Sequence, residues 1–577
     1  MSEPLLSIRE LAKRTGVAPS AHQLTNRTLS SRTGLPFAAE RVELRVELRA
    51  ELHVPPGGEV QALRSAVLVS LVSVVALGAS LAVAVTKGPE GRAEGVRSQQ
   101  MESQQLESRR SPASRLLTES QCRATPSIRL SCYDPAQIQA AYDEGTLFEE
   151  GVDGRGVTIA IVDSFGSPTI RRDLARFDAQ FHLPAPPSLR IIRPAGPVPP
   201  YDPGTTTMVG WAGETTLDVE WAHAAAPGAS LLVVETPVSE TEGPVGFAQI
   251  VEAENFVVDH HLGDVISQSF GANENTFSSA ADLESFRSAF VAAAAAGITV
   301  VASTGDTGVS DYTTATGHHY STTPTVTWPA SDPLVTAVGG TRLSLDASGR
   351  RTTSDQVWND SYNPAANDFV FGTSRPHPDA SGGGLSSIFS RPSYQSDVAS
   401  VVGDHRGIPD ISMSAACSGL VDTYQSFGGP TPPGWYYVCG TSEAAPLFAG
   451  VVALADQEAG RGLGAINPAL YAMQRAHEPG IVPVTKGNTT VSFEVNGTQH
   501  TVTGYSASAG YNLASGLGTV DVARFVPELV RWVGRVGTDV AYGFLAPRAT
   551  VEPHRLGGSQ PLAGAGLSFL SGGFPGR

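Results

Sequence analysis

Charged residues are scarce in this sequence, and basic residues are the scarcer kind. Asp, Glu, Lys and Arg make up 16% of the 577 residues, and 39 Lys and Arg stand against 56 Asp and Glu, which gives a formal net charge of −17 at pH 7. Proteins bind nucleic acid through clustered positive charge that neutralises phosphates. The acidic balance therefore argues against nucleic acid as the main partner.

One long apolar run, residues 65–85, reads SAVLVSLVSVVALGASLAVAV and lies between Arg64 and Lys87. Its 21 uncharged residues are long enough to cross a bilayer. It also contains Ala82-Val83-Ala84, the small-x-small pattern of a signal-peptide cleavage site. We interpret residues 65–86 as a transmembrane anchor or a signal peptide, with a buried core helix as a third interpretation. Either of the first two makes the chain beyond Lys87 extracellular, or membrane-anchored outside the cytoplasm.

Cysteine is rare, and all four cysteines lie beyond this apolar run, in the close pairs Cys122/Cys132 and Cys417/Cys439. No CxxC or nearby histidine spacing typical of zinc ligands accompanies them. An even number of cysteines in an exported region is typical of disulfides. We therefore expect the bridges Cys122–Cys132 and Cys417–Cys439.

The two ends of the chain differ in composition from its middle. Residues 1–64 form an N-terminal extension to which we assign no fold. Its segment Ser7–Val17 resembles the first helix and turn of a helix-turn-helix module, but the residues that follow lack the apolar periodicity of a recognition helix. Residues 87–131 are predicted as a polar linker, and residues 544–577 as a Gly-rich, disordered tail.

Between residues 132 and 543, apolar strand-like runs alternate with helical segments. The runs are VTIAIVD (157–163), SLLVVET (230–236), DVISQSF (264–270) and ITVVAS (298–303). Continuous apolar strands separated by helices indicate a mostly parallel sheet covered by helices on both faces. The fold class predicted for this domain is therefore α/β.

Three short motifs in this domain carry chemistry. GETTLDVE places Glu214 and Asp218 four residues apart, on one face of a helix. ITVVASTGDTGV runs an apolar strand into a Gly-bounded turn that presents Asp306. CGTSEAAPLFAGVVALA places Ser442 at the start of a long buried helix, where free backbone N–H groups and the helix dipole favour a developing negative charge.

These motifs, in this order, resemble those of the sedolisin family of serine-carboxyl peptidases. WPASDPLVTAVGGTRL (328–343), SGGGLSSIFSRPSYQ (381–395) and RGIPDIS (406–412) match the family as well, and the resemblance covers about residues 130–540. It implies a subtilisin-like three-layer fold and a serine-type endopeptidase that acts on protein or peptide substrates. Tripeptidyl-peptidase activity is an open alternative.

The resemblance also assigns roles to the motif residues. Glu214 would be the general base for Ser442, Asp218 would be hydrogen-bonded behind it, and Asp306 would line the oxyanion hole. A serine hydroxyl needs an adjacent base and a third group that orients the base. Since one acid of the pair must share a proton and Asp306 must be protonated to donate, activity is expected at acidic pH. The substrate strand is expected to pair alongside Ser267, Gln268, Ser269 and Phe270.

The sequence departs from the family in two respects. The segment between Lys87 and Cys132 is too short for the large N-terminal prodomain that most sedolisins carry. The family's C-terminal calcium site maps to residues that hold no carboxylate. The corresponding positions are Pro483, Val484, Ser508, Gly510 and Asn512. Calcium prefers anionic oxygens, so we expect no required cofactor and a degenerate calcium site.

Parts of the sequence also suggest two other functions. An ordinary subtilisin would use an Asp-His-Ser triad, and Asp163 occupies the place of its aspartate, but Glu214 lies where the histidine should be. His223 is further along the same helix and is interpreted as structural. The second is a membrane-anchored sensor or binding protein with a non-catalytic peptidase-like domain. The presence of Glu214, Asp218, Asp306 and Ser442 argues against a non-catalytic domain.

Overall fold

The computed structural model describes residues 116–240, 243–314, 319–429, 432–495 and 497–536, and the backbone of residues 109–110. All of them belong to one compact unit. The N-terminal extension 1–64, the apolar segment 65–86 and the tail 544–577 lie outside the described residues, so nothing here bears on the predictions made for them. Within the described part of the chain, no helix is both long and apolar enough to cross a membrane.

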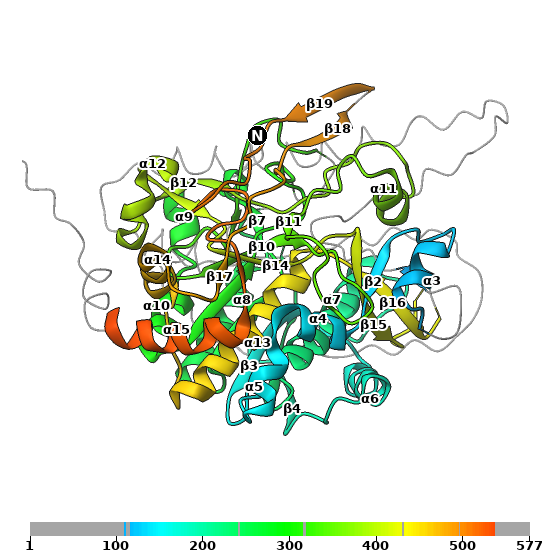
Figure 1. Ribbon diagram of the computed structural model, residues 1–577, viewed down its shortest axis with the longest axis horizontal. Helices are drawn as coiled ribbons and strands as arrows, with labels where there is room; N and C mark the ends of the chain where they lie inside the picture. The colour runs from blue at the N-terminus through cyan, green and yellow to red at the C-terminus, as the bar shows by residue number, and fades with distance from the viewer. Residues whose placement is uncertain are drawn as a thin grey trace, which may run out of the picture. The chain divides into compact units, whose positions relative to one another are not determined.

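A central sheet of eight strands organises the domain (Figure 1). Seven strands follow one another in the order β11-β10-β8-β6-β3-β5-β4, and β14 pairs with β10. Every pairing in this sheet is parallel except that of β10 with β11. The strands are β3 (Thr158–Ser164), β4 (Leu189–Ile192), β5 (Ser230–Thr236), β6 (Val265–Gln268), β8 (Thr299–Ser303), β10 (Thr336–Arg342), β11 (Gln356–Val357) and β14 (Ile411–Ser414). The four predicted apolar runs are β3, β5, β6 and β8, which confirms the expected α/β fold.

Successive side chains of these strands point into two different cores, because a strand alternates its side chains between the two faces of a sheet. On β3, Ile159 and Ile161 belong to one core, whereas Ala160 and Val162 belong to the other. Helices on the first face are α4 (Pro135–Tyr142), α5 (Glu144–Glu149), α6 (Ile170–Phe181), α7 (Thr206–Ala225), α13 (Thr441–Ala459), α14 (Asn467–Ala476) and α15 (Val522–Val536). Helices on the second face are α8 (Phe247–Asp259), α9 (Ala280–Glu284) and α10 (Ser288–Ala296).

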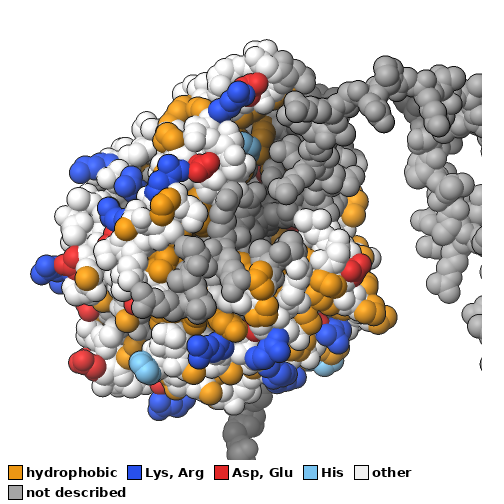
Figure 2. Space-filling model, turned by 90° about the vertical axis from the view of Figure 1, so that its right-hand side faces the viewer, with side chains coloured by type: hydrophobic (Ala, Val, Ile, Leu, Met, Phe, Trp, Pro, Cys, Tyr) orange, Lys and Arg blue, Asp and Glu red, His pale blue; other side chains and the backbone are white. Residues whose placement is uncertain are grey.

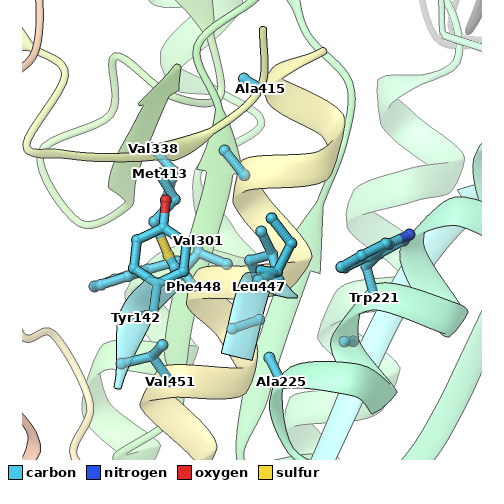
Figure 3. Packing of buried hydrophobic residues seen from close by; sticks show 14 of the residues in the cluster. Tyr142, Trp221, Ala225, Val301, Val338, Met413, Ala415, Leu447, Phe448 and Val451 are labelled. Carbon is cyan, nitrogen blue, oxygen red and sulfur yellow. The ribbon is translucent and has the colours of Figure 1, made fainter. Parts of the chain in front are cut away.

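The two helices α7 and α13 pack directly against each other. Their backbones approach closely because small residues meet: a Cβ at Gly450 would lie 2.5 Å from that of Ala225. Leu447, Phe448 and Val451 of α13 share one core with Trp221 and Ala225 of α7, and Figure 3 shows Leu447 on the side of α13 that faces Trp221. This packing fixes the start of α13 relative to the middle of α7.

Smaller elements surround the central sheet. One four-stranded sheet contains β1 (Arg109–Arg110), β16 (Gly434–Val438), β15 (Gly419–Gln425) and β2 (Ser131–Tyr133). The two-stranded sheets pair β7 (Ala272–Asn273) with β9 (Thr327–Trp328), β12 (Gly384–Ser390) with β13 (His405–Ile408), β17 (Ile481–Val482) with β20 (Thr519–Val520), and β18 (Val491–Val495) with β19 (Thr498–Val502). The remaining helical segments are α3 (Glu119–Ala124), η1 (Glu274–Thr276), α11 (Pro364–Phe371), η2 (Ser393–Val398) and α12 (Ala399–Val402).

Both predicted disulfides, Cys122–Cys132 and Cys417–Cys439, are formed. The first shows that the linker predicted over 87–131 ends too late, because α3 carries Cys122 and is tied to β2. Ile128 and Leu130 are also buried in the core. Residues 116–131 therefore belong to the folded domain. Their mostly polar composition predicts a linker, but the few apolar residues among them, such as Ile128 and Leu130, pack in the core.

Among the described residues on the face drawn in Figure 2, charged side chains of one sign do not form an extended field. Basic side chains occur there in small groups, with acidic and apolar side chains between them.

Candidate active site

Helix α7 carries both acids of the first motif. It begins at Thr206 and ends at Ala225, just before Pro227, whose ring cannot continue a helix. Glu214 is 2% exposed and Asp218 is fully buried. The i, i+4 spacing sets both carboxyls on one face of this helix. Two acids are thus held side by side in the interior.

Ser442 is the second residue of α13 and is 4% exposed. The first backbone N–H groups of a helix have no partner within the helix, so they can donate to a negative charge that forms there. Gly440 caps this helix with φ = +132°, and a Cβ at this position would lie 2.7 Å from Asp306 Oδ2. A glycine is therefore required where the chain passes Asp306 and enters α13.

Asp306 lies in the turn after β8 and is bound to the residue before Ser442. Its Oδ1 accepts hydrogen bonds from the backbone N–H of Thr441 at 2.7 Å and from the Thr441 hydroxyl at 2.6 Å. Burial raises the pKa of Asp306, and these two hydrogen bonds lower it in part, so that the net shift is upward. The turn and the start of α13 form one hydrogen-bonded unit.

Glu214 lies beside Ser442. Burial raises the pKa of Glu214 well above its usual range, and the carboxyls of Asp163, Asp306 and Glu240 raise it further. Ser442 acts as a hydrogen-bonding neighbour that lowers this pKa in part, although neither Glu214 oxygen has a fully formed hydrogen bond among the described residues. A carboxyl whose pKa is raised by burial therefore lies beside the serine hydroxyl.

Asp218 has its own hydrogen-bond donor, Ser269. The Ser269 hydroxyl donates to Asp218 Oδ1 at 2.9 Å and lies 3.4 Å from the carbonyl oxygen of Ser442. Burial raises the pKa of Asp218 well above its usual range, Asp163 and Glu214 raise it further, and Ser269 lowers it in part. Ser269 thus connects the acid pair to the nucleophile segment, a link that sequence spacing did not indicate.

A third acid, Asp163 at the end of β3, belongs to the same buried group. It is 1% exposed, and neither of its carboxyl oxygens has a fully formed hydrogen bond among the described residues. Burial raises its pKa to about 7, Thr215 lowers it in part, and Glu235 raises it. In the sequence, Asp163 suggests only the aspartate of an Asp-His-Ser triad, because its proximity to Glu214 and Asp218 depends on how β3 packs against α7.

The expected pairing of a substrate strand alongside Ser267 and Gln268 is wrong. Strand β6 is an interior strand: Ser267 and Gln268 are in register with Ile161 and Val162 of β3 on one side, and with β8 on the other. Both edges of β6 are therefore occupied. The Phe270 side chain is 1% exposed and lies in the second core. Ser269 and Phe270 follow the end of β6, and only their main chain stays a candidate for substrate pairing.

His223, the base of the rival mechanism, faces away from this group. Its Nε2 lies 2.8 Å from the carbonyl oxygen of Pro184 and 3.3 Å from Asp178 Oδ1. Burial lowers the pKa of His223 to about 4. This histidine binds the segment that follows α6, as the structural interpretation predicts.

The residues at the expected calcium positions come from two chain segments that meet. Val484 packs with Ala514 in a small apolar cluster, and a Cβ at Gly518 would lie 2.2 Å from the carbonyl oxygen of Val482. Pro483 offers no side-chain oxygen, and the amide nitrogen of Asn512 points at the carbonyl oxygens of Ser508 and Gly510. In the described part of the chain no group of three or more His, Cys, Asp or Glu could hold a metal ion. These residues do not fit a calcium ion.

The chain is similar to peptidases of known sequence and structure. Residues 204–471 match the Subtilase family. The chain is 31% identical to kumamolisin of Bacillus sp. (strain MN-32) over 411 residues, which are 69% of this chain and 64% of that protein. It is 29% identical to tripeptidyl-peptidase 1 of Homo sapiens over 332 residues, which are 55% of this chain and 52% of that protein. The chain thus spans between about half and about two thirds of these relatives.

A solved structure agrees with these sequence matches. Pseudomonas sedolisin, a serine-carboxyl proteinase complexed with two molecules of pseudo-iodotyrostatin, superposes with a TM-score of 0.56 at 25% identity. The superposition covers 71% of this chain and 99% of that chain. Glu214, Asp218, Asp306 and Ser442 all fall within the segment that matches the Subtilase family.

Proposed function

The chain belongs to the sedolisin family of serine-carboxyl peptidases, and on this basis we propose that it hydrolyses peptide bonds with Ser442 as the nucleophile. The observation that carries the proposal is the position of the Glu214 carboxyl beside the Ser442 hydroxyl, with Asp218 on the same face of α7. This is the arrangement of a nucleophile, a base and a group that orients the base.

In the proposed reaction, Glu214 accepts the hydroxyl proton as Ser442 Oγ attacks the carbonyl carbon of the scissile bond. The negative charge that develops on the carbonyl oxygen is stabilised by the backbone N–H of Ser442, at the start of α13, and by a protonated Asp306. Glu214 then gives the proton to the leaving amine, and an acyl-enzyme ester forms on Ser442. A water molecule, deprotonated in turn by Glu214, hydrolyses the ester.

The acid pair needs Asp218 because one carboxylate alone is a weak base for a hydroxyl. Asp218 shares a proton with Glu214 and receives a hydrogen bond from Ser269, which holds it in place. Raised pKa values for Glu214, Asp218 and Asp306 mean that the required protons are retained in acid and are lost as pH rises. The proposed enzyme is therefore active at acidic pH.

Substrates are proteins or peptides, and endopeptidase activity is the primary proposal. The similarity to human tripeptidyl-peptidase 1 makes removal of tripeptides from free N-termini the second. The substrate main chain would pair with Ser269 and Phe270 beyond the end of β6. No cofactor is required in this scheme.

The peptidase domain is proposed to act outside the cytoplasm. Two formed disulfides support this location, because they persist in oxidising compartments. Whether residues 65–86 anchor the chain or are cleaved is tested by the N-terminal sequence of the mature protein.

Purified protein and its Ser442→Ala variant should be compared on internally quenched peptides from pH 3 to pH 8. Hydrolysis that peaks in acid and vanishes in Ser442→Ala supports the proposal, whereas equal turnover in both proteins contradicts it. The same peptides with free and with acetylated N-termini separate the two modes of cleavage. An endopeptidase cuts both, and a tripeptidyl peptidase cuts only the free form.

A further inference from the structure

One side chain, that of Asn512, closes the loop between Ser508 and Leu517. Its Nδ2 donates to the carbonyl oxygens of Ser508 at 3.1 Å and Gly510 at 3.4 Å. Its Oδ1 accepts from the backbone N–H groups of Ala514 at 3.1 Å and Ser515 at 3.0 Å, and from the Ser515 hydroxyl at 3.2 Å. Asn512 is 4% exposed, and its hydrogen bonds to Ala514 and Ser515 are buried, whereas those to Ser508 and Gly510 are partly buried.

The partners fix which way the amide points. If the group were turned over, Oδ1 would face two carbonyl oxygens and the NH2 group would face two N–H donors, so that the hydrogen bonds would become repulsions. The nitrogen therefore stands where two carbonyl oxygens converge. Converging carbonyl oxygens are also what a calcium site offers, together with carboxylates.

In the part of the chain that the structure describes, no free carboxylate completes such a set at this loop. Gly516 packs against the backbone of Asp410, the acid next to the loop. The Asp410 side chain is already bound to Arg406, to the Tyr471 hydroxyl at 2.9 Å and to the N–H of Ala337 at 2.9 Å.

We propose that the Asn512 amide is an intramolecular substitute for a divalent cation, and that the single exchange Asn512→Asp converts this loop into a calcium site. In the wild type, the NH2 group supplies the positive end of a dipole to the two carbonyl oxygens, and no ion is needed. An aspartate keeps one oxygen for Ala514 and Ser515 but sets a negative oxygen against the carbonyl groups of Ser508 and Gly510. That arrangement is repulsive until a cation enters it.

The loop matters beyond its own hydrogen bonds. A Cβ at Gly383 would lie 2.4 Å from the carbonyl oxygen of Leu513, and the neighbouring Gly382 N–H donates to the carbonyl oxygen of Gly305 at 2.8 Å. Gly305 directly precedes Asp306. The Asn512 amide thus supports, through one intervening segment, the turn that carries a proposed oxyanion donor.

The test compares the wild type, Asn512→Asp and Asn512→Ala as full-length proteins, and it uses no activity measurement. The melting temperature is measured in EDTA, in millimolar calcium chloride and in magnesium chloride, and calcium binding is measured by isothermal titration calorimetry. Asn255→Asp is the matched control, because it makes the same charge change at an exposed hydrogen bond to Ser288. A ligand that binds only the folded state raises the melting temperature.

We expect the wild type to melt at the same temperature in EDTA and in calcium, with no heat of calcium binding. Asn512→Asp should melt several degrees lower in EDTA and recover in calcium but not in magnesium. Asn512→Ala should have a lower melting temperature than the wild type both in EDTA and in calcium, with no difference between the two conditions. Asn255→Asp should behave as the wild type does. If Asn512→Asp does not fold in EDTA, recovery of folded protein on refolding with calcium supports the proposal.

Three results would overturn it. The first is stabilisation of the wild type by calcium, which would show that the loop accepts the ion with its amide turned. The second is an Asn512→Ala variant as stable as the wild type, which would show that the hydrogen bonds of the Asn512 amide do not stabilise the loop. The third is an Asn512→Asp variant that calcium does not rescue.

Discussion

Thr441 donates two hydrogen bonds to the same carboxyl oxygen of Asp306, one from its backbone N–H at 2.7 Å and one from its hydroxyl at 2.6 Å. Both bonds occupy Oδ1 as an acceptor. A proton on Asp306 is therefore best carried by Oδ2, the oxygen that faces Gly440. Thr441, the first residue of α13, thus determines which oxygen of Asp306 can carry a proton and donate it in a hydrogen bond.

Asp306→Asn should retain part of the activity and extend the pH profile upward. An asparagine can accept both Thr441 bonds with its oxygen and donate with its nitrogen, but it does not titrate. Asp306→Ala should lose more, about 3–4 kcal/mol in transition-state stabilisation if one oxyanion donor is the main loss. The measurement is kcat/KM against pH for all three proteins. Equal losses in the two variants would contradict the donor role.

Glu214→Gln should nearly abolish turnover while the fold persists, since glutamine fills the same space but cannot accept the Ser442 proton. The matched control is Glu220→Gln on the same helix, where the buried Glu220 only accepts a hydrogen bond from the N–H of Tyr424. We expect near wild-type kcat in the control. An alkaline optimum for the wild type, with activity that survives Glu214→Gln, would exclude the carboxyl mechanism.

The strands and the site motifs could be predicted from the sequence because each depends on a local pattern of residues. Four apolar runs became β3, β5, β6 and β8, and GETTLDVE became the middle of α7. The order of the strands could not be read in the same way. The interior position of β6, which excludes Ser267 and Gln268 from substrate pairing, depends on pairing with β8 and with β3, the latter more than a hundred residues earlier in the chain.

Two further features also depend on tertiary contacts. Helix α9 ends at Glu284, and α10 begins only at Ser288. Between them Arg287 pairs with the buried Asp332. The hydrogen bonds of Asn512 could not be predicted from the sequence either, because four of its five partners are main-chain groups whose positions depend on the folded loop. In both cases a tertiary contact decided the local structure.

Ser269→Ala should lower kcat with little change in KM. The variant loses the donor to Asp218 Oδ1 and leaves a buried carboxyl oxygen unpartnered, which costs roughly 1–3 kcal/mol, or about 5- to 160-fold in rate if the whole cost falls on the transition state. Ser267→Ala on β6, two residues before Ser269, is the control, because the Ser267 hydroxyl has no partner among the described residues. Equal kinetics in the two variants would show that Ser269 does not position the acid pair.

Removal of the Cys417–Cys439 bridge by a double alanine substitution should lower stability by roughly 2–4 kcal/mol. Activity should fall as well, because Cys439 directly precedes Gly440 and the start of α13. Removal of Cys122–Cys132 should affect melting but not kcat, since α3 and β2 lie outside the site. Urea denaturation and kcat are measured for both variants. A kcat loss in the Cys122/Cys132 variant alone would contradict this assignment.

The fold should be most stable in acid, and Glu443 is the residue that tests this best. It follows Ser442 in α13 and is fully buried, and neither of its oxygens has a fully formed hydrogen bond among the described residues. Burial raises its pKa from 4.5 to about 8, and Ser414 lowers it in part. Between these values the folded protein holds a proton that the unfolded chain has released. The free energy of unfolding must therefore fall as pH rises from about 4.5 to about 8.

Glu443→Gln replaces the neutral acid with a group of the same shape that cannot ionise. We expect the wild-type melting temperature to decline across this pH range and the variant to decline less steeply, since one titrating group has been removed. The exposed Glu252 on α8 provides the control, because Glu252→Gln removes the same charge without a burial effect. Scanning calorimetry at half-unit pH steps gives the slopes. Parallel curves of melting temperature against pH for the wild type and Glu443→Gln would contradict this prediction, because they would show that Glu443 binds no extra proton in the folded protein.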